Sequence, residues 1–244
     1  MDQKFIKRTR PCKLVGERND LIKKLEQEGK LFSPLFYCDE KGGYCADDNI
    51  CIALVSQSKL PTRFGEFEIS VFQNNKDRKE HLLISRGRLN GAEQLPLRIH
   101  SQCQTGDIFG SLRCDCREQL EHALNTFSKL ENAALLYLKQ EGRGIGLANK
   151  IRAYHLQEQG LDTIEANEAL GFPDEMRDYE IAASMIKLVN IQSIVLFTNN
   201  PKKIQGLENY GINIVRREPV VIPPNPFNEK YLQTKKSRAG HLLE

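Results

Sequence analysis

Three cysteines lie close together in the middle of the chain, at positions 103, 114 and 116. Cysteine thiolates are common zinc ligands, and a site with three protein ligands keeps a fourth position for water, as catalytic zinc sites do. Such a metal makes a hydroxide available near neutral pH. A loop suits Cys114 and Cys116 better than a strand, where alternate residues lie about 7 Å apart. The spacing leaves three interpretations open: a catalytic zinc, a structural zinc completed elsewhere, or three free thiols.

A glycine-rich segment, QEGRGIG at 140–146, separates a predicted strand from a predicted helix. Glycines at such a turn let backbone N–H groups approach a phosphate, helped by the helix N-terminus. The Glu141 carboxylate can accept paired N–H donors of the kind that guanine presents, and Arg143 can bind phosphate with two hydrogen bonds. The segment lacks the Lys-Ser/Thr pair of a P-loop. The alternative is a plain tight turn with solvated charges.

Two further segments combine polar and charged residues. TNNPKK at 198–203 follows an apolar run and begins a predicted helix at its proline. Ligands bind at such strand ends in open α/β sheets, and a helix N-terminus with lysines suits a polyphosphate. DEMRD at 174–178 places acids beside Arg177, which suits a base with a positively charged partner. The alternatives are a capped helix with solvated lysines and a surface salt-bridge cluster.

The elements that must position these segments change in character along the chain. A short helix is predicted at 20–29. Apolar or alternating runs predict a β-rich region, with strands at 50–55, 66–72, 81–85 and 97–100, and an approach and turn at 59–65. The 3.6-residue period then predicts helices, at 118–129, 147–159, 179–188 and 201–210. Strands are predicted between them at 133–138, 193–198 and 212–215, and an extended segment at 219–228. The pattern predicts an α+β (mixed α/β) fold, in which an N-terminal β-rich region precedes alternating strands and helices around a mixed sheet.

The composition of the 244 residues excludes several classes of protein. Hydrophobic residues make up 40%, charged residues 27%, and no apolar run approaches the roughly 18 residues of a membrane span. The net charge of +3 is too balanced to indicate a nucleic-acid partner. The basic N-terminus has no apolar stretch after it, and seven cysteines are an odd number. We therefore expect a cytoplasmic protein without membrane or nucleic-acid partners, in which Cys38, Cys45 and Cys51 are free thiols.

Seven motifs, taken in order, resemble those of GTP cyclohydrolase II, the zinc enzyme that opens the riboflavin pathway. The resemblance extends from about residue 59 to residue 243. The motifs are HSQCQTGD (100–107), SLRCDC (111–116), QEGRGIGL (140–147), KIRAY (150–154), DTIEAN (162–167), TNNPKK (198–203) and GHLL (240–243).

The resemblance implies a reaction in which GTP and water give formate, pyrophosphate and 2,5-diamino-6-(5-phospho-ribosylamino)pyrimidin-4(3H)-one. Water activated by zinc attacks C8 of the guanine, the imidazole ring opens, and the formyl carbon leaves as formate. The polyphosphate is cut between its α and β positions with the help of Mg²⁺. The resemblance also implies one Zn²⁺ per subunit, GTP or a related purine nucleotide as substrate, and a homodimer.

The resemblance assigns roles to residues that match the family motifs. Cys103, Cys114 and Cys116 are the implied zinc ligands. Arg177 matches a proposed nucleophile toward the α-phosphorus, Glu175 a proton acceptor, and Tyr154 a tyrosine of the base pocket. Family contacts to GTP fall on Arg98, Ile99, His100, Ser101, Gln102, Gln119, Glu141, Gly142, Arg143, Thr163, Thr198 and Lys203.

Three residues depart from the family pattern. Gln102 replaces a glutamate before the first zinc ligand, Glu175 replaces an aspartate, and Arg117 replaces a glycine. Two alternatives follow: a divergent paralogue with a partial reaction or another purine nucleotide, and a non-catalytic GTP-binding regulator. The expected domains are an N-terminal extension of unknown role (1–58) and a GTP cyclohydrolase II-like catalytic domain (59–244).

Overall fold

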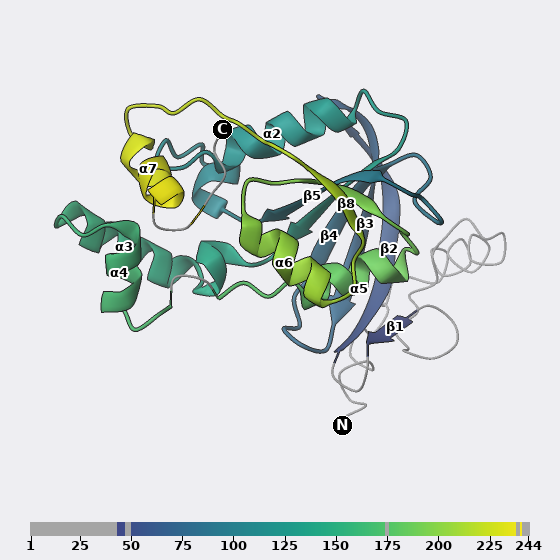
Figure 1. The fold of residues 1–244 in the computed structure, drawn as a ribbon, viewed down its shortest axis with the longest axis horizontal. Helices are drawn as coiled ribbons and strands as arrows, with labels where there is room; N and C mark the ends of the chain where they lie inside the picture. The colour runs from purple at the N-terminus through teal and green to yellow at the C-terminus, as the bar shows by residue number, and fades with distance from the viewer. Residues whose placement is uncertain (1–42, 47–49, 174–175, 238–239, 241–244) are drawn as a thin grey trace, which may run out of the picture.

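The computed structural model describes residues 43–46, 50–173, 176–237 and 240. Its described part is built around a mixed sheet of eight strands in the order β1-β2-β3-β4-β6-β5-β7-β8 (Figure 1). This arrangement confirms the α+β class that the sequence pattern predicts. The helix predicted at 20–29 lies outside the described residues.

The first half of the sheet is antiparallel, from β1 through to β6. Its strands follow one another along the chain as β1 (Gly43–Ala46), β2 (Ile50–Thr62), β3 (Gly65–Asn74) and β4 (His81–Arg86). The strands predicted at 66–72 and 81–85 form an antiparallel pair, β3–β4, as the sequence pattern predicts. The approach and turn predicted at 59–65 divide at Thr62: residues 59–62 continue β2 and pair with β3 as far as Thr62 opposite Gly65, and the turn follows at 63–64.

The second half of the sheet is parallel. β5 pairs with β6 on one side and β7 on the other, and β7 pairs with β8. These strands are β5 (Leu95–Ser101), β6 (Ala133–Leu138), β7 (Ile194–Phe197) and β8 (Ile214–Glu218). The crossover segments between parallel strands carry helices, as such connections require.

The helices predicted from the 3.6-residue period are all present, with ends displaced by one or two residues. They are α2 (Cys116–Phe127), α3 (Leu147–Glu158), α5 (Glu180–Leu188) and α6 (Pro201–Asn209). The sequence reading did not foresee the short helices α4 (Thr163–Ala169) and α7 (Glu229–Ser237), or the single turns η2 (Gln104–Ile108) and η3 (Glu141–Gly144). None of the described helices is long and apolar enough to cross a bilayer.

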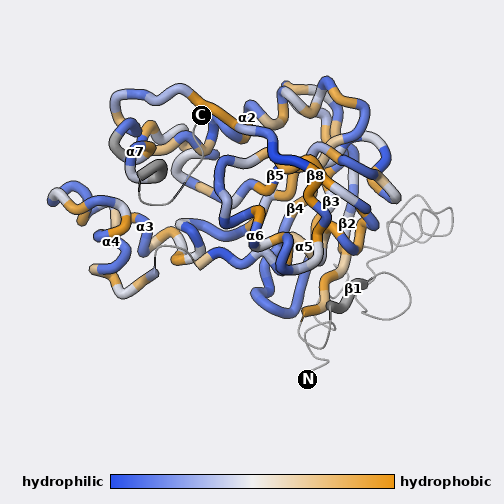
Figure 2. Tube along the Cα trace, viewed as in Figure 1, coloured by the Kyte–Doolittle hydropathy of each residue, from blue (hydrophilic) through white to orange (hydrophobic). Residues whose placement is uncertain are grey.

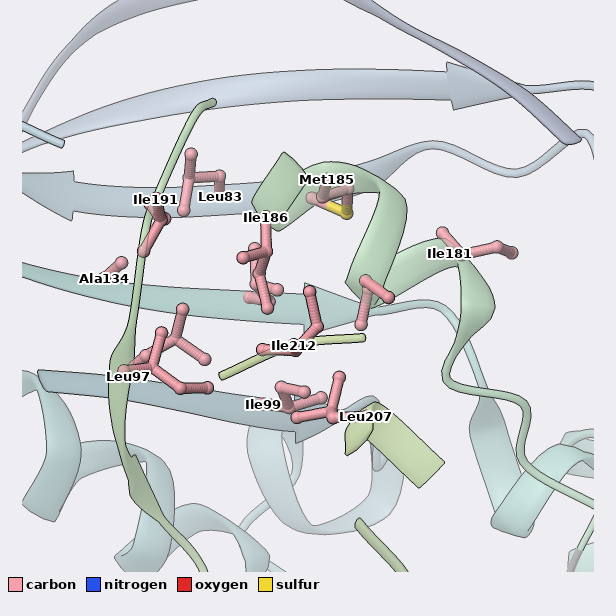
Figure 3. Packing of buried hydrophobic residues seen from close by; sticks show 14 of the residues in the cluster. Leu83, Leu97, Ile99, Ala134, Ile181, Met185, Ile186, Ile191, Leu207 and Ile212 are labelled. Carbon is pink, nitrogen blue, oxygen red and sulfur yellow. The ribbon is translucent and has the colours of Figure 1, made fainter. Parts of the chain in front are cut away.

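Apolar side chains pack on both faces of the sheet. On one face, α5 contributes Ile181, Met185 and Ile186 to a large cluster with the strands, and Leu207 of α6 joins it (Figure 3). On the other face, Phe127 of α2 and Phe67 of β3 are buried in a smaller cluster. Figure 2 shows the apolar residues gathered along the strands. Because burial of each large side chain stabilises the fold by about 1.5–3 kcal/mol, the two clusters fix the strands that precede the site.

Two features of β2 bear on the N-terminal region. The strand runs without interruption through residue 58, with Gln57 opposite Ser70 and Lys59 opposite Glu68. The boundary predicted between residues 58 and 59 therefore falls inside a strand, and the division into two domains stays a prediction. Cys51 on this strand is disulfide-bonded. This corrects the expectation of a free thiol there.

Candidate active site

A cavity lies where the parallel strands end. β6, β5 and β7 are neighbours that run in the same direction. The segments that follow them emerge at one edge of the sheet, which is where open α/β sheets bind their ligands. Gln102 after β5, Gln140 after β6 and Thr198 after β7 all line the same cavity. The sheet thus brings together three motifs that are far apart in the sequence.

Most residues that the sequence analysis selected line this cavity. They are Arg98, His100, Ser101, Gln102, Cys103, Cys114, Cys116, Gln119, Glu141, Gly142, Arg143, Tyr154, Thr163, Arg177, Thr198 and Lys203. Ile99 differs, because its side chain belongs to the core and its carbonyl accepts a hydrogen bond from Lys203 Nζ at 2.7 Å. Glu175 lies outside the described residues.

The three cysteine thiols form a compact cluster. Their Sγ atoms all lie within 4.8 Å of one another, and the sulfurs of Cys103 and Cys114 are 3.6 Å apart. Sulfurs bound at about 2.3 Å to one tetrahedral zinc would be separated by about 3.8 Å, so this donor set fits the metal. Within the described part of the chain, no fourth metal-ligating side chain joins the cluster. The three thiols line the cavity and offer the number of protein ligands that an open zinc site has.

Gly106 makes room for this cluster. A Cβ at this position would lie 2.8 Å from the sulfur of Cys114 and 3.2 Å from that of Cys103. Contacts this short require the sulfurs to move, because real Cβ atoms essentially never come within 3.0 Å of another atom. The buried Gly106 therefore sets the space between the thiols, and η2 holds it there.

Asp107 fixes the loop that carries the first thiol. Its Oδ2 accepts hydrogen bonds from the backbone N–H of Cys103 at 2.9 Å and from the Tyr137 hydroxyl at 2.7 Å. Its Oδ1 lies 3.0 Å from His100 Nε2, and the His100 ring stacks on Tyr137 with centroids 5.5 Å apart. Burial lowers the pKa of His100, which favours the neutral ring. One buried carboxylate thus joins β5, β6 and the thiol loop.

The other two thiols stand where a loop becomes a helix. Cys116 is the first residue of α2 and Cys114 precedes it in a turn, which confirms that the pair is not on a strand. Hydrogen bonds from the Cys114 and Cys116 thiols hold the pKa of Cys103 well below its usual range. The bond to Cys103 raises the pKa of Cys114 to about 11.

Both oxygens of Glu141 are engaged within the protein. Oε1 accepts hydrogen bonds from the Gly142 backbone N–H at 2.9 Å and from Lys150 Nζ at 2.8 Å, while Oε2 accepts one from the Gln104 N–H at 2.6 Å. The sequence analysis expected this carboxylate to be available for paired N–H donors of a ligand. Instead it ties the glycine-rich turn to the thiol loop. Gly142 and Arg143 both adopt the left-handed conformation, with φ of 61° and 58°.

Two buried cations line the same cavity. Arg98 is 4% exposed and donates hydrogen bonds to the carbonyl of Phe197 at 3.2 Å and to Gln119 Oε1 at 2.6 Å. Burial lowers its pKa to about 10, which still leaves it charged at neutral pH. Lys203 in α6 is also buried, at 7% exposure. Buried cations in a cavity favour an anionic ligand, since an anion offsets part of the cost of their burial.

The start of α6 adds neutral donors beside these cations. Asn200 caps the helix by accepting a hydrogen bond from the Lys202 N–H at 2.9 Å, and its own N–H donates to Thr198 Oγ1 at 3.0 Å. Asn199 exchanges hydrogen bonds with the backbone of Val220 in the segment after β8. Helix N-termini of this kind bind phosphate. The capped helix was the alternative to a phosphate site, and the structure shows the cap inside the cavity.

Tyr154 and Arg177 reach the cavity from outside the sheet. The Arg113 guanidinium carbon lies 4.9 Å from the centre of the Tyr154 ring, and burial raises the pKa of Tyr154 to about 12. The segment with Arg177 is held through its neighbours. The Met176 N–H donates to the carbonyl of Arg143 at 3.2 Å, and Gln140 Nε2 donates to the carbonyl of Asp178 at 2.6 Å.

Several residues of the cavity were not selected from the sequence. Gly106 lies between Cys103 and Cys114 in the sequence. A glycine at such a place is a signal that other atoms approach the backbone closely. Lys150 is a lysine in the first turn of a helix, where the dipole disfavours a cation, so its position was also a signal. Asn199 lies within the selected segment 198–203, but its pairing with Val220 could not be predicted, because only the fold brings the two segments together.

The sequence of this chain matches that of a known protein family over the region that forms the cavity. The model of the GTP cyclohydrolase II family matches residues 53–219. The chain belongs to the GTP cyclohydrolase II family. The match begins within β2 and ends just after β8, so it includes the three thiols and the segments after β5, β6 and β7.

Named relatives resemble the chain over most of its length. It is 52% identical over 192 residues to "GTP cyclohydrolase-2" of Picrophilus torridus, which covers 79% of this chain and 100% of the relative. A protein of the same name from Tolumonas auensis is 50% identical, over 79% of this chain and 98% of the relative. The "Riboflavin biosynthesis protein RibBA" of Endomicrobium trichonymphae is 51% identical over 76% of this chain, but the match covers only 46% of that longer protein.

Proposed function

We propose that this protein hydrolyses GTP in riboflavin biosynthesis, opening the imidazole ring at C8 with release of formate and pyrophosphate. The observation that carries the proposal is the three-thiol cluster, which lines one cavity with the buried cations Arg98 and Lys203. Family membership and relatives at about half identity support the same reaction. A metal-ligating cluster beside cationic groups suits a substrate that carries both a reactive ring and phosphates.

The proposed cofactor at the cluster is one Zn²⁺ per subunit, held by Cys103, Cys114 and Cys116. The separation of the sulfurs and the space left by Gly106 support this choice of metal. When bound, zinc with three protein ligands supplies a water that is activated near neutral pH. Mg²⁺ is proposed to accompany the polyphosphate of the substrate.

The chain's own residues are proposed to bind and orient the nucleotide. Arg98, Lys203 and the N-terminal turn of α6 offer positive charge and N–H donors to the phosphates. Tyr154, held under the Arg113 guanidinium, would contact the base. Arg177 is proposed as the nucleophile toward the α-phosphorus. Glu175 is proposed as its proton acceptor.

The assembly and cellular location are also proposals. A homodimer in the cytoplasm, without nucleic-acid or membrane partners, fits the family and the absence of membrane-crossing helices among the described residues. Size-exclusion chromatography with light scattering would measure the oligomeric state directly.

The deciding experiment is incubation of zinc-loaded protein with GTP and Mg²⁺, followed by identification of every product by mass. Formate, pyrophosphate and the diaminopyrimidine phosphate are expected in equal amounts. The reaction should stop with a chelator and in Cys114→Ser, while a Cys51→Ser variant, changed outside the cavity, should retain it.

Gln102 lines the cavity where the family has a glutamate, so the products must be examined for an incomplete reaction. A product that retains the formyl carbon, or turnover of another purine triphosphate in preference to GTP, would indicate the divergent paralogue. Tight binding of GTP without consumption would indicate a regulator. Either result would overturn the proposed reaction.

A further inference from the structure

Lys150 makes direct contact with a proposed metal ligand. It lies in the first turn of α3, and its Nζ donates hydrogen bonds to Cys103 Sγ at 3.0 Å, Thr105 Oγ1 at 2.9 Å and Glu141 Oε1 at 2.8 Å. An ammonium group has three N–H donors. All three are therefore used inside the protein, and none is left for a substrate unless one of these bonds breaks.

The position of this lysine is costly in two ways. A cation in the first turn of a helix opposes the helix dipole. Removing an ammonium from water is also unfavourable unless it is paired, and the Lys150 side chain is only 12% exposed. The carboxylate of Glu141 and the sulfur of Cys103 offset these costs. The lysine is thus held at the thiol cluster by specific partners.

The Lys150 contacts join three pieces of chain into one unit. Lys150 comes from α3, Glu141 from the glycine-rich turn, and Cys103 from the end of the loop after β5. The second oxygen of Glu141 accepts the Gln104 N–H at 2.6 Å, one residue after Cys103. The position of the Cys103 sulfur is therefore fixed both through its backbone and at the sulfur atom itself.

A hydrogen bond to a metal-bound thiolate also changes its chemistry. An N–H group from a cation draws electron density from the sulfur, which then donates less charge to the metal. The metal remains a stronger Lewis acid than it would be with an unbonded thiolate, and such outer partners tune metal sites generally.

We propose that Lys150 is a positioning residue that fixes the Cys103 sulfur and withdraws charge from it, and so sets the affinity and Lewis acidity of the metal site. The inference rests on the proposed zinc site. It assigns Lys150 to the metal and not to the nucleotide, because its three donors are already engaged.

The test compares Lys150→Met with Arg152→Met. Arg152 lies on the same helix, is exposed, and donates a hydrogen bond to Asn149 at 2.7 Å, so its variant removes an equal charge away from the thiols. Zinc affinity is measured by competition with a chelator, and Co²⁺-loaded protein reports the sulfur-to-metal charge-transfer absorption. Lys150→Met should bind zinc about 10–100-fold more weakly. Its charge-transfer band should move to longer wavelength, because the sulfur electrons are less stabilised.

Steady-state kinetics separate this role from nucleotide binding. In Lys150→Met, kcat for GTP should fall about tenfold or more with KM unchanged, since a group that contacts a proposed metal ligand and not the nucleotide alters the chemical step. Lys150→Arg should recover part of both the affinity and the band position. Arg152→Met should match the unchanged protein in every measurement.

Three results would overturn the inference: an unchanged Co²⁺ spectrum with unchanged zinc affinity, a rise in KM with kcat unchanged, or equal effects in both variants. If Lys150→Met does not fold by circular dichroism, Lys150→Gln, which keeps a donor but no charge, carries the same comparison. Failure of the unchanged protein to bind Co²⁺ or consume GTP would instead refute the proposed function, so the two failures are distinguishable.

Discussion

The cysteine cluster and the two buried cations of the cavity, Arg98 and Lys203, differ in how far apart their residues lie in the sequence. All three thiols come from residues 103–116, and a single turn with Gly106 at its centre holds them together. Arg98 and Lys203 come from β5 and α6, line the same cavity, and are joined through the carbonyl of Ile99, which accepts a hydrogen bond from Lys203. The proposed metal-ligating part is local, whereas the proposed anion-binding part depends on the sheet.

This difference predicts that the two parts can be damaged separately. A change within the thiol turn should remove the metal and leave the fold intact. A change among the cations should weaken nucleotide binding and leave the metal in place. Metal content and KM for GTP, measured on the same preparations, are the two readouts that test the separation.

The largest effect is expected from Gly106→Ala. The new Cβ would lie 2.8 Å from the Cys114 sulfur, so the thiols must spread apart. We expect zinc affinity to fall about 100-fold or more, near or beyond the upper range for changes around metal ligands, with activity lost in parallel. Metal analysis and circular dichroism would check this, and full zinc content in a folded variant would show that the turn does not shape the site.

Lys203→Met should reverse this pattern. It removes a buried charge and leaves the Ile99 carbonyl without its 2.7 Å donor. Hydrogen bonds of charged groups contribute about 1.5–3 kcal/mol, so kcat/KM for GTP should fall about 10–100-fold while zinc content stays at one per chain. Lys202→Met is the matched control, because Lys202 is the next residue but is exposed. Loss of zinc in Lys203→Met would contradict the separation.

A smaller effect is expected where the Arg177 segment meets the β3–β4 turn. Lys76 forms ion pairs with Asp178 and Glu180, directly after Arg177, and this pairing raises the pKa of Lys76. The pairs are partly exposed, so they should contribute about 0.2–1 kcal/mol. Lys76→Met should lower kcat about two- to fivefold, with Lys76→Arg restoring it.

Lys59 on β2 is exposed, and Lys59→Met serves as the control for this lost charge. Activity of wild-type protein should decline at high salt in the same proportion, because exposed ion pairs are screened. Equal kcat in Lys76→Met and wild type would show that the other contacts of the segment, such as those to Gln140 and Arg143, hold it without Lys76.

The smallest effect is a pH dependence of stability through His81. This fully buried ring accepts the Lys139 N–H at Nδ1 and lies 3.2 Å from Asp77 through Nε2, so the fold requires its neutral form. Burial holds the pKa of His81 below the usual value of a histidine, about 6.5. Because the pKa of His81 is lower in the folded state than in the unfolded state, protonation favours unfolding. The contribution of His81 to the free energy of unfolding is therefore fully present above about pH 6.5 and is lost as pH falls through the folded-state pKa.

Urea unfolding at a series of pH values between 8 and 5 would measure this loss. The buried His100 has the same sign of shift and contributes to the same decline. A His81→Leu variant should be less stable at pH 8 and should lose less on acidification. An identical pH profile in the variant would exclude His81 as a source.

Much of this fold was predictable because its elements carry strong local patterns. The strand at 133–138 and the helix at 201–209 have continuous apolar runs or a proline-initiated start, and the structure places both within a residue of the predicted bounds. The approach to the predicted turn at 59–65 is itself part of a strand, because β2 continues to pair with β3 through residues 59–62, and this pairing depends on the fold. The short helix α4 was missed, although Asp162 and Glu165 form a capping box that could have revealed it.

The sequence by itself determined the ligand type, the number of thiols and the order of the motifs, since these depend only on residues that are near neighbours in the chain. The tertiary structure decided which motifs share a cavity, that Glu141 is bound within the protein, and that Lys150 contacts the Cys103 sulfur. These contacts arise because three parallel strands end at one edge of the sheet. The order of the strands in the sheet cannot be predicted from local sequence patterns. The chemistry was therefore readable in the sequence, while its environment required the fold.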